Sequence, residues 1–105
     1  MDLKDLQKEI KKFTEKNNLD SPAEFRVLDL VSEIGEVPKE ILKMTDYGTK
    51  PLKKNSEIDS ELGDTLYSLI VVANKLDIDL EVALKKVLEK YSSRLKKGSA
   101  GSEVE

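Results

Sequence analysis

The amino-acid sequence predicts an all-α protein with four helices in one domain. Apolar residues recur at spacings of three and four in four segments, and no segment alternates as a half-buried strand would. Turn-favouring residues separate the segments. Because 105 residues bury only a modest core, we expect an antiparallel four-helix bundle that oligomerisation completes. The domain is expected over residues 1–97, followed by a disordered tail over 98–105.

The first helix is predicted from its apolar stripe and the second from a start signal. The stripe of the first comprises Leu3, Leu6, Ile10 and Phe13. This helix should run to about Lys16. Ahead of the second helix, Ser21 can cap, Pro22 suits the first turn, and Glu24 can complete a capping box.

The second helix should continue to Met44 through an internal proline. Pro38 lacks the amide that would bond the Ile34 carbonyl, so we expect one bent helix. Residues 45–55 lack periodicity and contain turn residues, so they are predicted to form a loop.

The third and fourth helices each follow a polar residue that can cap a helix. Ser56, with Asp59 three residues later, marks the start of the third, and Asp79 caps the fourth. Residues 66–73 of the third helix are apolar on almost every side, more than a small monomer can bury. Oligomerisation through this helix is therefore expected.

Composition narrows the chemistry that is available. Lys and Arg number 18 against 21 Asp and Glu, giving a net charge of -3, which disfavours binding to a nucleic-acid polymer. Cysteine and histidine are absent, which excludes thiolate nucleophiles, sulfur or imidazole metal ligands and a serine–histidine relay. No apolar run approaches the roughly 20 residues of a membrane span, so a cytoplasmic protein without membrane contact is expected.

Two near-identical acidic elements dominate the sequence. Residues 32–36 read SEIGE and residues 60–64 read SELGD, so each places two carboxylates three residues apart on one helix face. Antiparallel packing of the two helices would bring Glu33, Glu36, Glu61 and Asp64 together. A cluster of like charges is unfavourable by itself, and a cation bound between the four carboxylates would offset their repulsion.

The ligand type indicates which cation this would be. Oxygen ligands alone select Mg²⁺, with Mn²⁺ as a substitute, and Ca²⁺ is also compatible. Gly35 and Gly63 lie between the paired acids, where a missing side chain would let the other helix or a ligand approach. The nearby Asp29, Glu40 and Glu57 are interpreted as surface charges or outer groups of the site, and the aromatic residues as core or loop groups.

These residues resemble a known family. The pairs Glu33/Glu36 and Glu61/Asp64, together with LVSEIGEV, ELGDTL and LEVAL through Tyr91, are similar to the MazG-type all-α nucleoside triphosphate pyrophosphohydrolases. The resemblance implies Mg²⁺-dependent hydrolysis of an NTP or dNTP to the monophosphate and pyrophosphate, as in nucleotide-pool house-cleaning. It also implies that the four acids are catalytic metal ligands and that the protein forms a homodimer or homotetramer.

By the same resemblance, Lys90 and Arg94 match basic positions that bind the substrate. From their spacing and charge alone, the two residues lie one turn apart and could neutralise a triphosphate, or could simply complement the helix dipole. Ser32 stands where the family often has another glutamate, and Leu88 where it often has asparagine.

Two other functions are compatible with the sequence. One is a non-catalytic helical interaction module whose third helix binds a partner while the acids serve solubility. The other is a family member that binds nucleotides without turnover.

Overall fold

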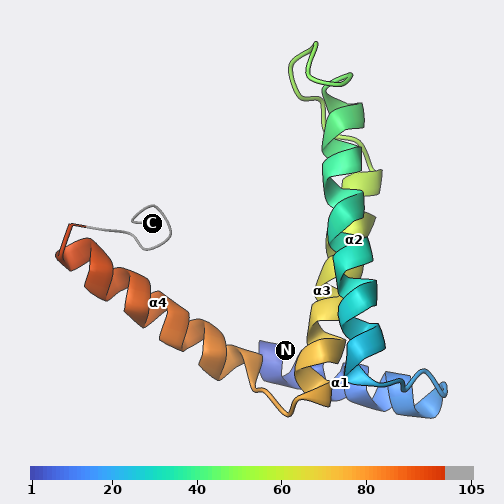
Figure 1. The fold of residues 1–105 in the computed structure, drawn as a ribbon, viewed down its shortest axis with the longest axis vertical. Coiled ribbons are helices and arrows are strands. Elements are labelled where there is room, and N and C mark those ends of the chain that lie inside the picture. The colour runs from blue at the N-terminus through green and yellow to red at the C-terminus, as the bar shows by residue number, and fades with distance from the viewer. Residues whose placement is uncertain (99–105) are drawn as a thin grey trace.

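The computed structural model describes residues 1–98, which form four helices and no strand, as the sequence predicts. The predicted tail lies, from residue 99 onward, outside the described residues. No helix within residues 1–98 is both long and apolar enough to span a bilayer. The helices are α1 (Leu3–Lys16), α2 (Ala23–Met44), α3 (Glu57–Lys75) and α4 (Leu80–Lys96) (Figure 1).

The centre of the fold is the antiparallel pair of α2 and α3, which lie side by side along their lengths (Figure 1). Most of the buried apolar side chains come from α3, and Met44 at the end of α2 joins them. The buried apolar residues of α3 are Ile58, Ile70, Val71 and Ala73.

A buried glutamine on α1 ties α1 to the junction of α3 and α4. The Gln7 side-chain amide donates to the Asn74 side chain at 3.1 Å and to the Ile78 carbonyl at 2.9 Å. Its oxygen accepts the Leu80 amide at 2.9 Å, and Asn74 donates back to the Gln7 carbonyl at 3.0 Å. Because a buried amide is costly unless it is hydrogen-bonded, this network holds α1 across the foot of α3 and positions the start of α4.

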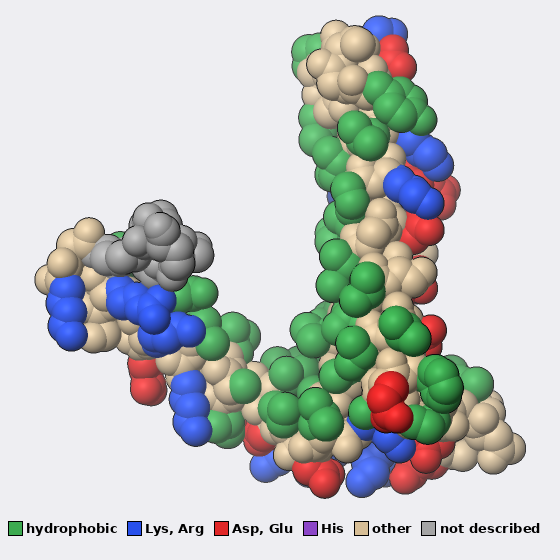
Figure 2. Space-filling view, viewed as in Figure 1, with side chains coloured by type: hydrophobic (Ala, Val, Ile, Leu, Met, Phe, Trp, Pro, Cys, Tyr) green, Lys and Arg blue, Asp and Glu red, His purple; other side chains and the backbone are tan. Residues whose placement is uncertain are grey.

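The last helix does not close the bundle within one chain. From the Gln7 junction, α4 contacts α1 and then runs away from the α2–α3 pair (Figure 1). None of its residues is buried. Apolar side chains gather on the side of α2–α3 that faces α4 and along α4 itself (Figure 2). Leu88 of α4 is 57% exposed and Val31 of α2 is 63% exposed, so no element within residues 1–98 covers either apolar stripe.

The helix starts agree with prediction in position, but two caps differ in chemistry. The predicted capping box of Ser21 and Glu24 is wrong, because Pro22 occupies the N-cap of α2 and no side chain caps it. Asp79 caps α4 as predicted, accepting the Val82 amide at 3.1 Å. Ser56 precedes α3, but its side chain makes no capping bond.

Asn55 takes the capping role at α3. Its side-chain oxygen accepts the backbone amides of Glu57 at 3.1 Å and Ile58 at 3.2 Å. Asparagine and serine are comparable cap residues, so sequence alone does not choose between these neighbours.

The continuity of the second helix across the internal proline and the loop that follows it agree with the prediction. α2 continues as a single helix through Pro38 to Met44. Residues 46–56 contain turns and bends but no helix or strand. The loop starts tightly, because Asp46, Tyr47 and Gly48 all have positive φ.

Replacing the actual cap should destabilise the fold more than replacing the predicted one. Asn55→Ala removes the α3 cap and also a bond from Asn55 to the buried Glu40 carboxylate. We expect it to lower the free energy of unfolding by about 1–2 kcal/mol. Ser56→Ala is the matched control and should change it little. Urea unfolding followed by circular dichroism measures both, and an equal effect of the two substitutions would contradict this assignment.

Candidate metal centre

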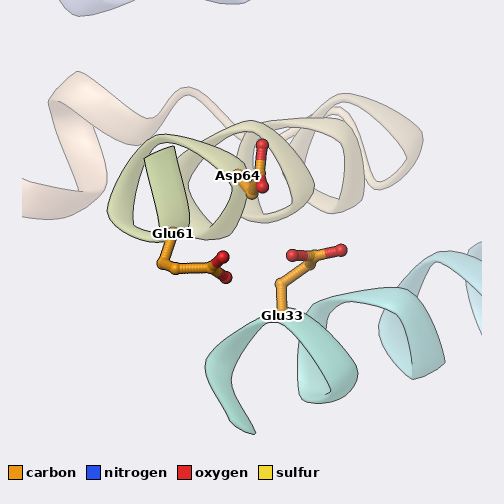
Figure 3. Close-up of side chains that lie close together, drawn as sticks. All are labelled: Glu33, Glu61 and Asp64. Atoms are coloured by element: carbon orange, nitrogen blue, oxygen red, sulfur yellow. The ribbon is translucent and has the colours of Figure 1, made fainter. Parts of the chain in front are cut away.

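Three of the four predicted acids converge on one spot between α2 and α3. Glu33 projects from α2 toward Glu61 and Asp64 on the facing turn of α3 (Figure 3). One carboxylate oxygen from each lies within 4.8 Å of the others. Glu33 and Glu61 are half-buried and Asp64 is exposed, so the cluster opens to solvent on one side.

Glu36, the fourth predicted acid, lies beside this cluster without joining it. Its carboxylate is 3.5 Å from the Lys39 ammonium, in an i,i+3 pair on α2. Its charge is still felt at Glu61, since among the neighbouring carboxylates Glu36 raises the pKa of Glu61 most. A side-chain rotation away from Lys39 would be needed for Glu36 to act as a ligand.

The electrostatics of Glu61 reflect its place among the acids. Its pKa is raised, first by partial burial and then by the negative charges of Glu36, Asp64, Glu40 and Glu33. Each of these effects disfavours the ionised carboxylate. A bound cation would act in the opposite sense, favouring ionisation.

The donor set fits a hard divalent cation. Glu33, Glu61 and Asp64 offer carboxylate oxygens only, from two rigid helices, with room for water on the exposed side. This is the ligand type of Mg²⁺ and Mn²⁺, and Mg²⁺ commonly keeps several waters beside a few carboxylates.

The three outer acids have different surroundings. Glu40 is 7% exposed, and its carboxylate accepts bonds from Asn55 at 3.2 Å and Lys43 at 3.3 Å. The same contact raises the pKa of Lys43. Glu40 is therefore no surface charge, whereas Asp29 and Glu57 are exposed.

The glycines between the acids face open space. A Cβ atom on Gly35 or Gly63 would meet no atom within 4 Å, leaving aside adjacent residues and the local helix backbone. The expected close approach of the other helix is therefore wrong, since the α2–α3 packing leaves room at both positions. Approach of a ligand or of a second chain is compatible with this space.

The basic residues predicted to bind substrate are not brought to the acids within one chain. Lys90 and Arg94 lie on α4, which runs away from α2 and α3 (Figure 1). The Lys90 ammonium lies 5.2 Å from the centre of the Tyr91 ring. Their proposed role therefore depends on a second chain or on movement of α4.

A cavity of about 420 Å³ extends from the acids and contains residues that the sequence analysis did not single out. Besides Glu33, Asp64 and Asp29, it is lined by Arg26, Tyr67 and Ser68. Arg26 lies two helical turns before Glu33, so it shares a face of α2 with that acid. That spacing is the one signal in the sequence, and it is weak because a cation seven residues from an acid is common in a charge-rich helix.

The chain belongs to the MazG family. A model of the MazG nucleotide pyrophosphohydrolase domain matches residues 23–99, which include all four acids of the repeated elements. The family assignment agrees with the resemblance seen in the sequence, and the family is described as one of nucleotide pyrophosphohydrolases.

Individual relatives agree with this assignment. The uncharacterised protein YpjD of Bacillus subtilis is 34% identical over 97 residues, covering 88% of this chain and 85% of YpjD. The crystal structure of a Bacillus-conserved MazG protein, a nucleotide pyrophosphohydrolase, matches with a TM-score of 0.73 and 32% identity over 87% of this chain and 89% of its own. A solved structure of YpjD gives 0.72 and 34%, over 90% and 96%.

Metal binding should reverse the effect that removing one carboxylate has on the melting temperature. Without divalent ions, Glu61→Gln should raise the melting temperature, because it relieves repulsion from four neighbouring carboxylates. With Mg²⁺ or Mn²⁺, the wild type should gain stability by mass action and Glu61→Gln should gain much less. Differential scanning fluorimetry at constant ionic strength measures this, with Glu57→Gln as the control. Equal metal-dependent shifts in wild type and Glu61→Gln would rule out the site.

Proposed function

We propose that this protein is a Mg²⁺-dependent nucleoside triphosphate pyrophosphohydrolase that releases a nucleoside monophosphate and pyrophosphate. The observation that carries the proposal is the convergence of Glu33, Glu61 and Asp64 within 4.8 Å, in a chain of the MazG family. An NTP or dNTP is the proposed substrate. Such an enzyme would act in the cytoplasm, clearing unwanted nucleotides from the pool.

The four acids are the proposed catalytic metal ligands. Glu33, Glu61 and Asp64 are already close together, and Glu36 would join them by leaving Lys39. A bound Mg²⁺, or Mn²⁺ in its place, would polarise phosphate oxygens and lower the pKa of water. The rigid helices α2 and α3 hold Glu33, Glu61 and Asp64 in place, so these three carboxylates need little reorganisation when substrate binds.

A second copy of the chain is the proposed partner, in a homodimer or homotetramer. The chain exposes 7886 Å², whereas a compact monomer of this size exposes roughly 5,900 Å². The excess is larger than the roughly 800 Å² that each partner buries in a stable interface. Much of this exposed surface is apolar and lies along α2, α3 and α4 (Figure 2).

Charge favours α4 of the second copy as the element that covers the α2–α3 pair. α4 carries six basic and two acidic residues over 81–97, and the pair it would cover bears the acidic cluster. Covering the apolar stripe beside the acids would bring Lys90 and Arg94 of one copy near the site of the other. Both residues are proposed to bind the substrate phosphates in this way.

Turnover tests the proposed function directly. Purified protein with Mg²⁺ and a mixture of nucleoside triphosphates should release pyrophosphate, measured by a coupled colorimetric assay. Glu61→Gln should lower kcat/KM by at least about 100-fold, because it removes a ligand charge from the centre. Lys12→Met serves as a control on the exposed side of α1. Absence of wild-type activity, or full activity of Glu61→Gln, would refute the assignment.

Mixing two inactive variants tests the contribution of α4 from a second copy. If one site uses Glu61 of one chain and Arg94 of the other, mixed dimers of Glu61→Gln and Arg94→Ala contain one intact site. After subunit exchange, such mixtures should recover roughly a quarter of wild-type activity. Glu61→Gln mixed with Asp64→Asn is the matched control, because both changes fall on the same helix. No recovery in the first mixture would contradict the shared site.

The same experiments separate the two other functions. A nucleotide-binding family member without turnover would gain stability from metal and nucleotide but release no pyrophosphate. An interaction module would respond to ionic strength alone, since solvated acids bind Mg²⁺ weakly.

A further inference from the structure

Two separate cavities of different chemistry lie along the α2–α3 pair, one on either side of the acids. Along the α2–α3 pair, α2 runs from Arg26 through Glu33 and Glu36 to Lys43. The end near Arg26 also contains Tyr67 and Ser68. At the other end, a separate cavity of about 410 Å³ is lined by Lys43, Lys50 and Lys53 together with Asp46. Lys43 pairs with Glu40 and Lys50 with Asp46, so the three lysines still outnumber the one acid of this cavity. The acids therefore lie between a lysine-rich end and an end with one cation and one aromatic ring.

This polarity orients a nucleoside triphosphate. Release of pyrophosphate requires the α-phosphate at the acids, with the β- and γ-phosphates on one side and the nucleoside on the other. The lysine-rich end suits the strongly charged phosphates. The end with Tyr67 and Ser68 suits a flat, weakly polar group, and about 420 Å³ is the size of a small-molecule pocket.

Arg26 is unusual among the described residues of this chain. Its side chain is only 13% exposed, and the Asp29 carboxylate lies 3.7 Å from its Nη1 atom, beyond hydrogen-bond distance. Its Nε is the one buried side-chain polar atom of residues 1–98 that has no hydrogen-bond partner. Such a donor is costly, and a small rotation into the cavity would let it meet an acceptor.

The aromatic ring of this cavity, Tyr67, is held in place by a second aromatic ring. Phe13 of α1 contacts Tyr67 edge to face, with ring centres 6.4 Å apart and planes at 87°. Tyr67 also lines the cavity, so a base that enters the cavity can stack against this ring.

We propose that Arg26, Tyr67 and Ser68 form the nucleobase subsite of this enzyme, and that Arg26 makes it selective for guanine. The proposal rests on the proposed function for the position of the phosphates. A guanidinium fork matches the O6 and N7 acceptors of guanine, whereas adenine presents a donor at the corresponding position. Asp29 beside Arg26 offsets its charge, which makes a neutral base a better partner than a phosphate.

The test is a comparison of nucleotides in wild type and Arg26 variants. Wild type with Mg²⁺ should show its highest kcat/KM with GTP and dGTP among the canonical nucleotides. Arg26→Lys keeps the charge but loses the fork, so the values for GTP and dGTP should fall about 10- to 100-fold. Values for ATP and CTP should change by less than about threefold. Arg26→Met should behave similarly, and Lys12→Met should match wild type.

A binding measurement separates this proposal from the proposed function. Calorimetry with the non-hydrolysable α,β-imido analogues of GTP and ATP, in the presence of Mg²⁺, reports base selectivity without turnover. Tighter binding of the GTP analogue, lost in Arg26→Lys, supports the subsite even in a protein without pyrophosphate release. Equal losses for every nucleotide would assign Arg26 to phosphates or to folding and overturn the proposal. So would a wild type without guanine preference, or variants that retain it; melting curves confirm that each variant is folded.

Discussion

The packing of two acidic helix turns against each other is the constraint on which the rest of this structure depends. Glu33 faces Glu61 and Asp64 because α2 and α3 lie antiparallel along their lengths. The resulting repulsion works against this packing, so the apolar residues of α3 must supply the attraction. The fold thereby holds the carboxylates in an arrangement that a bound cation would stabilise, as the proposed chemistry requires.

A polar network at the loop end fixes the register of that pair, and a second network at the foot fixes α1 against α3. At the loop end, Asn55 joins the start of α3 to the buried Glu40 of α2. At the foot, Gln7 and Asn74 bind α1 to α3. Since each residue advances a helix by about 100°, a slip of one position would turn the acids away from each other. Satisfied buried polar groups specify a register in a way that apolar contacts alone do not.

Periodicity predicted the four helices well because it depends only on local spacing. Neighbouring cap residues such as Asn55 and Ser56 have similar propensities, so the choice between them required tertiary contacts. The repeated acids indicated a shared site, yet Arg26 was missed because a single cation in a charge-rich helix has no distinctive pattern. The open space at Gly35 and Gly63 could not be predicted from the sequence either, since it depends on how far apart the helix backbones lie.

The direction of α4 follows from what the rest of this short chain offers it to pack against. α1 and the Gln7 junction fix where α4 begins, and nothing in residues 1–98 then draws it onto α2 and α3. An amphipathic helix with no buried residue is stable only if its apolar face is covered. The exposed stripes of α2 and α3 present a matching surface, and a second copy is the one partner certain to carry both surfaces. Assembly and completion of the phosphate site would then be a single event, because the helix that covers the apolar stripe also carries Lys90 and Arg94.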